Sequence, residues 1–276
     1  AGDYTVYYKV VGDKNHNDYA VKSIPVTIQR KPLTDISIEL TPDSFVYDGQ
    51  VKLPEVTVKF TEGKTETVVP KTEYDWSCNN TAPTDEGTYT ITISDATGGN
   101  YDLSNVATKT ATFTIGKIPQ DELVIEGKPT TTNYGDSFQL SVSGGSANGA
   151  ISWSTDGPAI VDSDGNVTIT DVGEVTITVK KAASINYFET QAQWSFTATP
   201  RPVTASVTVD DKAYDGTTSA AVTAATITTV NSDTVTIDPA SITATFDTPA
   251  VGTGKTVTLD TSKAQVTGKD VGKYEI

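Results

Sequence analysis

The chain has 276 residues and a formal net charge of −15, a balance that argues against nucleic acid or an anionic membrane surface as a partner. Its single cysteine, Cys78, excludes an intrachain disulfide, so packing or another crosslink must hold the fold together. The sequence contains no apolar run of membrane-spanning length and no signal peptide, so we expect no direct membrane insertion. It also lacks an initiator Met, which indicates a piece of a longer protein.

The composition favours strands over helices. Thr, Val, Tyr and Ile are abundant while Met is absent, and such residues fit a pleated, half-buried surface. No segment carries apolar side chains at helical spacing. A chain of this length is expected to hold about two to three small domains.

A short glycine-led motif, Glu86–Ile91, organises the sequence. It recurs as Ala1–Val6, Val172–Ile177 and Val271–Ile276. The copies lie about a domain's length apart, which indicates a serial array of related units. The third copy has Val175 where the others have Tyr.

Residues 1–32 predict two strands, Tyr4–Val11 and Ser23–Gln29, joined by the polar loop Asp13–Asp18. Apolar side chains of the first strand recur every second residue, as expected for one face of a strand. Two strands alone are marginally stable in water. This segment is therefore expected to be the C-terminal part of a domain that is truncated here, closed by Lys31-Pro32.

Residues 33–118 predict one complete domain with apolar and polar residues alternating along its strands. The expected strands are Ile36–Leu40, Glu55–Phe60, Glu66–Val69, Tyr74–Cys78, Tyr89–Ser94 and Thr110–Ile115. Glycine-containing turns separate them.

Residues 119–201 predict a second complete domain, in which Phe138, Leu140 and Val142 alternate and Asp164-Gly165 forms a turn. The two complete domains share an Asn-Tyr pair twelve residues after the motif position, at Asn100-Tyr101 and Asn186-Tyr187. The first segment has Asn17-Asp18-Tyr19 instead. This shared detail supports homologous units.

Residues 202–276 predict a third unit that ends inside its motif strand at Tyr274-Glu275-Ile276. By analogy with its neighbours, it is expected to lack the rest of that strand and the last one. The fold class expected for the whole is all-β: tandem immunoglobulin-like antiparallel β-sandwiches in an extended array, with partial domains at both ends. The Gly-x-Tyr of the motif is similar to the tyrosine corner of such domains, in which the phenol bonds to the backbone.

Three elements resemble the Tyr-Asp-Gly element of the YDG and MBG repeat families. They are Phe45–Gly49, Lys212–Thr218, and Val251–Val257 followed by Gly272-Lys273-Tyr274. In addition, Asp162–Thr168 with Val172–Ile177 is similar to a Big-2 bacterial Ig-like repeat. The resemblance implies a long, repetitive, secreted or surface-bound bacterial protein, hence an extracellular location. It carries over no catalytic residues.

No constellation for catalysis, cofactor binding or metal binding can be assembled. Asp162, Asp164 and Asn166 alternate loosely like a calcium loop, but the distal carboxylate that such a loop needs is missing. A hairpin turn explains them better, and the loop Asp13–Asp18 is treated in the same way. His16 is the only histidine, so it supports neither a triad nor a multi-His site. Asp210-Asp211 are expected to be a solvated strand end.

The remaining candidates are expected to be structural. Cys78 is expected to be a buried, inert thiol, with a reactive thiol as the less favoured alternative. Trp76, Trp153 and Trp194 could stack on sugars, but their alternating strand positions favour the sandwich cores. An intramolecular Lys–Asn or Lys–Asp amide could replace disulfides, although the sequence singles out no pair.

The preferred functional interpretation is a non-catalytic stalk or fibre segment. Its joints at Lys31–Leu33, Lys117–Pro119 and Pro200–Pro202 are short and carry proline, which restricts their motion. The alternative is an adhesin module that binds glycans or host proteins through inter-strand loops. The candidate loops are Asn79–Glu86, Gly98–Asn105 and Gly144–Gly149. An enzyme is the least favoured class.

Head-to-tail self-association is a further possibility. Residues 1–32 of one chain could complete residues 202–276 of another, because an unpaired sheet edge accepts an added strand. Simple truncation of a longer protein is the preferred explanation of the partial units.

Overall fold

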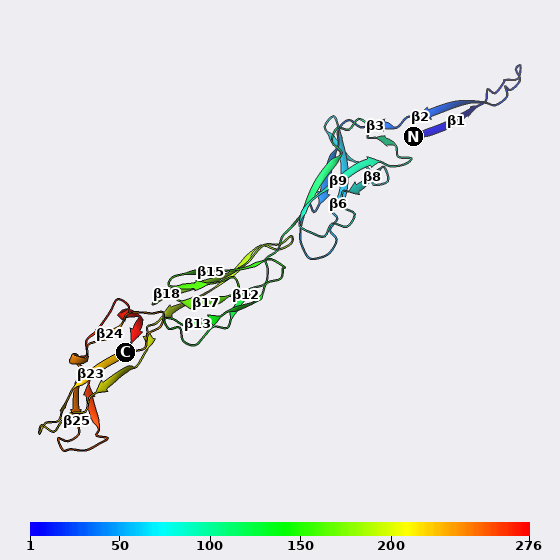
Figure 1. The fold of residues 1–276 in the computed structure, drawn as a ribbon. Helices are drawn as coiled ribbons and strands as arrows, with labels where there is room; N and C mark the ends of the chain where they lie inside the picture. The colour runs from blue at the N-terminus through cyan, green and yellow to red at the C-terminus, as the bar shows by residue number, and fades with distance from the viewer. The chain divides into compact units, whose positions relative to one another are not determined.

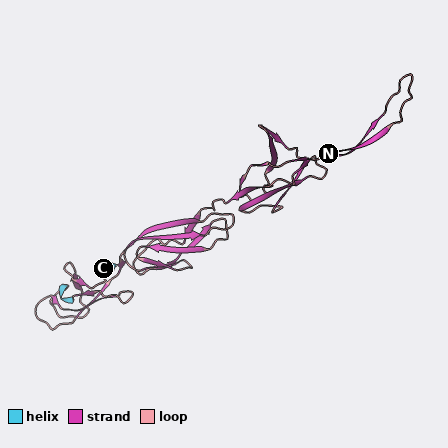
Figure 2. Ribbon diagram, turned by 90° about the horizontal axis from the view of Figure 1, so that it is seen from above, coloured by secondary structure: helices cyan, strands magenta, loops and turns pink.

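The computed structural model describes all 276 residues and separates into two compact units. The first unit comprises residues 1–119 with Ser184–Phe188, and the second comprises Gln120–Ala183 with Glu189–Ile276. Strands provide nearly all regular structure, and the only helical segments are two 3₁₀ turns, η1 (Pro239–Ser241) and η2 (Val271–Lys273) (Figure 2). No helix has the length and apolar character of a bilayer-crossing segment.

The first unit begins with an antiparallel ribbon that we call the N-terminal hairpin (Figure 1). Its strands are β1 (Gly2–Tyr8) and β2 (Lys22–Ile28), and Gly2 pairs with Ile28. The side chains of this ribbon are exposed, including the alternating Tyr4 and Val6. The period-two pattern therefore identified the strands, although no second sheet covers their apolar face.

A sandwich of two sheets, which we call the first sandwich, follows the hairpin. One sheet has the order β4-β6-β7 and the other the order β5-β11-β9-β8. The strands are β4 (Ser37–Thr41), β5 (Ser44–Val46), β6 (Glu55–Glu62), β7 (Thr65–Val68), β8 (Tyr74–Cys78), β9 (Gly87–Asp95) and β11 (Thr110–Gly116). Two-residue strands β3 (Lys31–Pro32) and β10 (Tyr101–Asp102) pair in parallel.

The core of the first sandwich is made by the predicted alternating residues. Val58, Ile91 and Phe113 have no exposed surface, and the rings of Tyr89 and Phe113 stack at 5.4 Å. Burying such side chains contributes roughly 1.5–3 kcal/mol each. This core explains why the alternation of β6, β9 and β11 was visible in the sequence.

The second unit contains a sandwich, the second sandwich, with its own core around Val167, Ile177 and Val179. Its sheets have the orders β12-β14, β13-β17-β16 and β15-β18-β19. The strands are β12 (Leu123–Glu126), β13 (Ser137–Gln139), β14 (Ser141–Gly144), β15 (Ile151–Asp156), β16 (Ala159–Val161), β17 (Asn166–Ile169), β18 (Gly173–Lys181) and β19 (Thr190–Ala198).

The second unit ends in short strands that we call the C-terminal module. Its sheets have the orders β20-β28, β21-β23, β22-β25-β26 and β24-β27. The strands are β20 (Arg201–Pro202), β21 (Ala205–Val209), β22 (Ser219–Ala220), β23 (Val222–Ile227), β24 (Thr236–Ile237), β25 (Thr243–Phe246), β26 (Val257–Asp260), β27 (Val266–Thr267) and β28 (Tyr274–Glu275). The predicted all-β class of tandem immunoglobulin-like sandwiches is confirmed by the sheets of both units.

One predicted core residue is wrong. Trp153 and Trp194 pack against the core of the second sandwich, but Trp76 is 40% exposed. Trp76 lies on β8, which forms the edge of its sheet. An edge strand has a neighbour on one side only, so an alternating pattern there does not guarantee burial.

Candidate interdomain junctions

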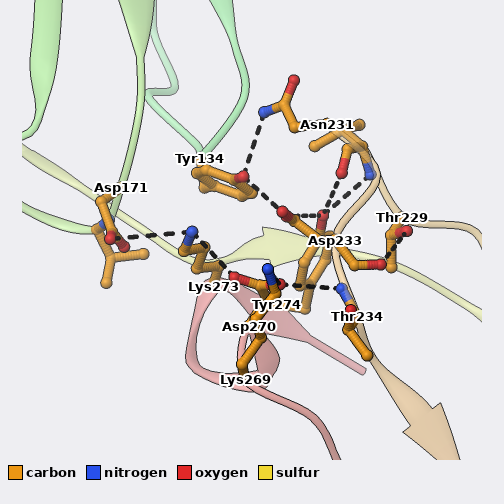
Figure 3. A network of polar contacts seen from close by, with 12 residues as sticks. Tyr134, Asp171, Thr229, Asn231, Asp233, Thr234, Lys269, Asp270, Lys273 and Tyr274 are labelled. Atoms are coloured by element: carbon orange, nitrogen blue, oxygen red, sulfur yellow. Dashed lines mark hydrogen bonds and ion pairs between the residues drawn. The ribbon is translucent and has the colours of Figure 1, made fainter.

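Three side chains meet where the C-terminal module adjoins the second sandwich (Figure 3). The phenols of Tyr134 and Tyr274 each lie 2.7 Å from Oδ2 of Asp233, to which both donate. Their rings meet edge to face, with centroids 5.7 Å apart. Tyr134 is 2% exposed and Tyr274 6% exposed. A single carboxylate thus ties an aromatic pair together away from solvent.

A tight turn presents this carboxylate. Asn231 and Ser232 both have positive φ, 55° and 59°, and Asp233 N donates to Val230 O at 3.0 Å. Two successive positive φ angles define a type I′ turn, in which Asn is favoured. The turn also directs Val230 N to the Tyr274 hydroxyl at 2.9 Å. The same phenol therefore accepts one hydrogen bond and donates another.

Burial and the Asp233 carboxylate determine the acidity of the Tyr274 phenol. Removal from solvent, followed by the hydrogen bond to Asp233, raises the pKa of Tyr274 to about 12. Both causes act against the phenolate, because burial disfavours charge and Asp233 is itself negative. The phenol is therefore held as a hydrogen-bond donor.

An ion pair lies beside the aromatic contact. Lys273 Nζ is 3.2 Å from Asp270 Oδ1, 4.0 Å from Asp171 Oδ2 and 5.0 Å from the centre of the Tyr134 ring. The backbone N–H of Thr234, which donates to Asp270, is the main cause that lowers the pKa of that carboxyl. Because Asp171 precedes β18 and Tyr134 precedes β13, Lys273 contacts two loops of the second sandwich.

The connecting segment is itself part of the C-terminal module. Arg201 and Pro202 form β20, which pairs in parallel with Tyr274 and Glu275 of β28. The Arg201 guanidinium donates to Tyr134 O at 3.2 Å and to Asp136 Oδ1 at 3.1 Å. The proline-containing joint is therefore hydrogen-bonded on both sides, which restricts it further than proline alone.

The first unit contains the same arrangement beside the N-terminal hairpin. Lys31 and Pro32 pair in parallel with Tyr101 and Asp102, as Arg201 and Pro202 pair with Tyr274 and Glu275. Asn100 Oδ1 accepts from the amino group of Ala1, the residue before the motif glycine. Tyr101 thus occupies the place of Tyr274.

A second example within the first unit involves the segment Ser184–Phe188. The bridge between Ile118 and Tyr187 is parallel, and the rings of Tyr47 and Tyr187 meet edge to face at 5.7 Å. Asn186 accepts from Glu86 N at 2.8 Å and donates to Asp85 Oδ1 at 2.9 Å. Glu86 also precedes a motif glycine, so Asn186 repeats the contact of Asn100.

This equivalence corrects one reading of the sequence. Gly272-Lys273-Tyr274 was interpreted as a fourth copy of the motif that opens β9 and β18, but Tyr274 pairs as Tyr101 and Tyr187 do. The strand equivalent to β9 is β26, since β25 pairs with β26 as β8 pairs with β9. The Asn-Tyr pair was the better guide to residue 274.

The motif tyrosine makes the predicted corner contact in the first sandwich. Tyr89 donates to Asp85 O at 2.8 Å, four residues upstream. The C-terminal module has Lys255 at the position of Tyr89. The two loops are aligned by an equivalent backbone hydrogen bond, from Asp247 N to Thr256 O in the module and from Asn79 N to Thr90 O in the first sandwich. Lys255 precedes Thr256 as Tyr89 precedes Thr90. Lys255 Nζ donates to Ala250 O at 3.0 Å, so an ammonium replaces the phenol.

The predicted turn at Asp162 has the geometry of an Asx turn. Asp162 Oδ1 accepts from the backbone N–H of Asp164 and of Asn166, each at 2.9 Å. The Asn166 side chain and its backbone N–H lower the pKa of the Asp162 carboxyl. Gly165 has φ of 83°. These contacts are what a hairpin turn requires.

The other candidate residues lie apart from one another. His16 Nδ1 is 2.8 Å from Asp13 Oδ1, and both side chains are exposed. Cys78 is half-buried, with Sγ 3.6 Å from Asn79 Oδ1. Asp210 accepts from Thr223 Oγ1 at 3.0 Å. No three His, Cys, Asp or Glu side chains gather closely enough to hold a metal ion.

Sequence reasoning did not single out Tyr134 or Asp233. Tyr134 lies in Asn133-Tyr134-Gly135-Asp136, where the order of Gly and Asp is reversed relative to Tyr47-Asp48-Gly49. Asp233 has no local signal beyond the Asn231-Ser232 turn. A contact across a distance of 99 residues in sequence carries no periodic pattern.

This geometry defines a protein of serial immunoglobulin-like β-domains that share a recurring junction. Family models identify its parts: the chain contains an MBG domain at residues 34–117 and a YDG domain at residues 199–276. No curated protein matches the chain at the sequence level.

The chain is distantly similar to several solved structures. Surface layer protein SbsC, domains 1–6, is 14% identical with a TM-score of 0.27, over 96% of this chain and 41% of that one. FdeC, an Escherichia coli adhesin, is 14% identical with a TM-score of 0.29, over 87% and 94%. One chain from the crystal structure of mouse coronavirus receptor-binding domain complexed with its murine receptor is 13% identical with a TM-score of 0.26. The match covers 59% of this chain and 98% of that one.

Proposed function

We propose that this chain is a non-catalytic spacer segment of a long, repetitive bacterial surface or secreted protein, which holds another domain away from the cell. In this proposal residues 119–201 form a Big-2-like domain between the MBG and YDG domains. The supporting observation is the junction in which Tyr134 and Tyr274 share Asp233. A spacer requires that neighbouring domains keep one orientation, and a buried, hydrogen-bonded joint supports this because a shift would leave buried polar groups unpaired.

Support for the spacer also comes from the loops that a binding module would use. In the first unit, the loop Asn79–Glu86 is engaged by Asn186 through Asp85 and Glu86. The loop Gly98–Asn105 carries β10, which pairs with β3. Two of the three loops proposed for the adhesin alternative are thus occupied by contacts within the chain.

The test is a distance distribution across the junction of the second unit. Spin labels would be attached through Gln191→Cys on β19 and Thr258→Cys on β26, both exposed positions, in a Cys78→Ser background. We expect one narrow distance in the full chain and a broad one after Asp233→Ala. A broad distribution in the parent chain would contradict a spacer role.

A matched control separates the junction from general loss of stability. Thr223 is exposed and belongs to the same module, with its hydroxyl on Asp210 at 3.0 Å. Thr223→Ala should leave the distance narrow. Broadening by both variants would mean that the module loosens as a whole.

A further inference from the structure

An open pocket lies between two loops of the C-terminal module. One loop joins β21 to β22 and the other joins β25 to β26, and the space between them is about 480 Å³. Its rim includes Tyr214, which is 69% exposed, and Val251, which is 83% exposed. Large apolar side chains exposed together at a concave surface are typical of an interaction site.

The first wall of this pocket repeats the Tyr47 loop of the MBG domain. Thr217 N donates to Asp215 Oδ1 at 2.9 Å, as Gln50 N donates to Asp48 Oδ1 at 2.9 Å. Gly216 and Gly49 have φ of 79° and 77°. In both loops a lysine binds the aspartate. Tyr214 therefore stands where Tyr47 stands.

The second wall repeats the loop that precedes β9. The backbone bonds that align Asp247 with Asn79 also align Thr256 with Thr90. Counting back from Thr256, Val251 corresponds to Asp85 and Gly252 corresponds to Glu86. In the MBG domain those residues receive Asn186. In the second sandwich the corresponding residue, Asp171, receives Lys273.

The two loops of this pocket thus correspond to loops that, in the first and second sandwiches, bind a tyrosine turn of the same chain. Tyr47 receives the ring of Tyr187, and Tyr134 receives the ring of Tyr274. The two lysines of the pocket are satisfied internally: Lys212 is bound by Asp215 and Thr217, and Lys255 by Asp247 and Ala250. The ring of Tyr214 remains open to a partner.

We propose that this pocket is the docking socket for the Asn-Tyr turn of a further MBG- or YDG-type domain. The tyrosine of that turn meets Tyr214 edge to face, and the residue before it contacts the backbone of Val251-Gly252. The inference rests on the proposed spacer function and extends it, because each domain then carries a socket at one end and a tyrosine turn at the other.

The test uses the full chain extended by a second copy of its own residues. In the first chimera residues 190–276 are repeated after Ile276. The added β19 then follows Tyr274 at the spacing at which β19 follows Tyr187, and the linker and the module with the added Lys273-Tyr274 come after it. In the second chimera residues 104–276 are repeated, which supplies Asn186-Tyr187. The register follows from the equivalence of Tyr101, Tyr187 and Tyr274.

The readout is the rate at which Tyr214 of the original copy is nitrated, followed by mass spectrometry of its peptide. In the added copy Tyr214→Phe leaves only one tyrosine at this position. We expect about tenfold slower nitration in a chimera than in the parent chain, as for a contact that is open about a tenth of the time. Changing the added tyrosine to Ala should restore the parent rate. Tyr7, which is 72% exposed, should react equally in all proteins.

Several outcomes would overturn the socket. Unchanged nitration of Tyr214 in both chimeras is one, and an added copy that stays unfolded in both is another. Protection that appears in the parent chain at high concentration would assign the pocket to a second copy instead. Spin labels at Gln191 and Thr258 of the original copy, in the same chimeras, report whether the junction of Tyr134 and Tyr274 is intact, so failure of the spacer proposal is measured separately.

Discussion

Tyr134 and Tyr274 lie on different domains of the second unit, yet each phenol is 2.7 Å from the same oxygen of Asp233. Asn231 Nδ2 lies 3.2 Å from the Tyr134 hydroxyl, to which it donates, and Val230 N donates to that of Tyr274. Every polar atom of the aromatic pair therefore has a partner inside the junction. Specific orientation follows, because a shift of either ring would leave a buried group unpaired.

Tyr274→Phe should lower the stability of the C-terminal module. The change removes the donor to Asp233 and leaves Val230 N without its acceptor. An unpaired buried group costs about 1–3 kcal/mol. Chemical denaturation of the full chain measures the effect, and Tyr7→Phe on the exposed hairpin serves as the control. Equal stability of Tyr274→Phe and parent would show that the shared carboxylate does not hold the module.

The junction should weaken at high pH. The pKa of Tyr274 is raised to about 12 in the folded chain from an ordinary value of 10.0. A raised pKa means that the neutral phenol is favoured by folding, so its contribution is complete below pH 10 and is lost as pH rises toward 12. Stability measured across this window should fall less steeply in Tyr274→Phe than in the parent chain. Parallel curves would contradict the assignment.

The sequence predicted the long strands because burial on one face leaves a two-residue period. Tyr74–Cys78 was predicted with the observed bounds, and β9 and β11 within one or two residues. The two-residue strands β3, β10 and β20 were not predicted, because two residues show no period, and β28 was predicted only as the start of a longer motif strand. These short strands are the ones that form the junctions.

The site was only partly visible for a related reason. The Asn-Tyr pairs were recognised as a shared feature, but their role depends on a parallel pairing with the preceding linker. Tyr274 was assigned to the wrong equivalence because Gly272 precedes it, and η2 places that glycine in a 3₁₀ turn rather than at the start of a long strand. The local sequence around Tyr274 therefore fits two structural equivalences, and the strand pairing of Tyr274 distinguishes them.

Tyr89→Phe should destabilise the MBG domain by about 1 kcal/mol, the usual contribution of one hydrogen bond. The lost bond is the one from the phenol to Asp85 O at 2.8 Å, while the stacking on Phe113 stays. The transition of the MBG domain in calorimetry of the full chain reports the change. Tyr214→Phe, at an exposed ring, is the control and should leave the midpoint unchanged. If the midpoint of Tyr89→Phe equals that of the parent, the corner hydrogen bond does not stabilise this domain, and the absence of a hydroxyl at Val175 has no cost either.

Core substitutions should reveal whether the division at residues 118 and 119 separates two folding units. Phe113 belongs to one core and Ile177 to another, and neither has exposed surface. Phe113→Ala should cost about 3–5 kcal/mol and Ile177→Ala about 2–5 kcal/mol. In calorimetry of the full chain we expect each variant to shift a different transition and to leave the other in place. A common shift of all transitions by either variant would show that the two cores unfold together, and the predicted division into separate domains would then be wrong.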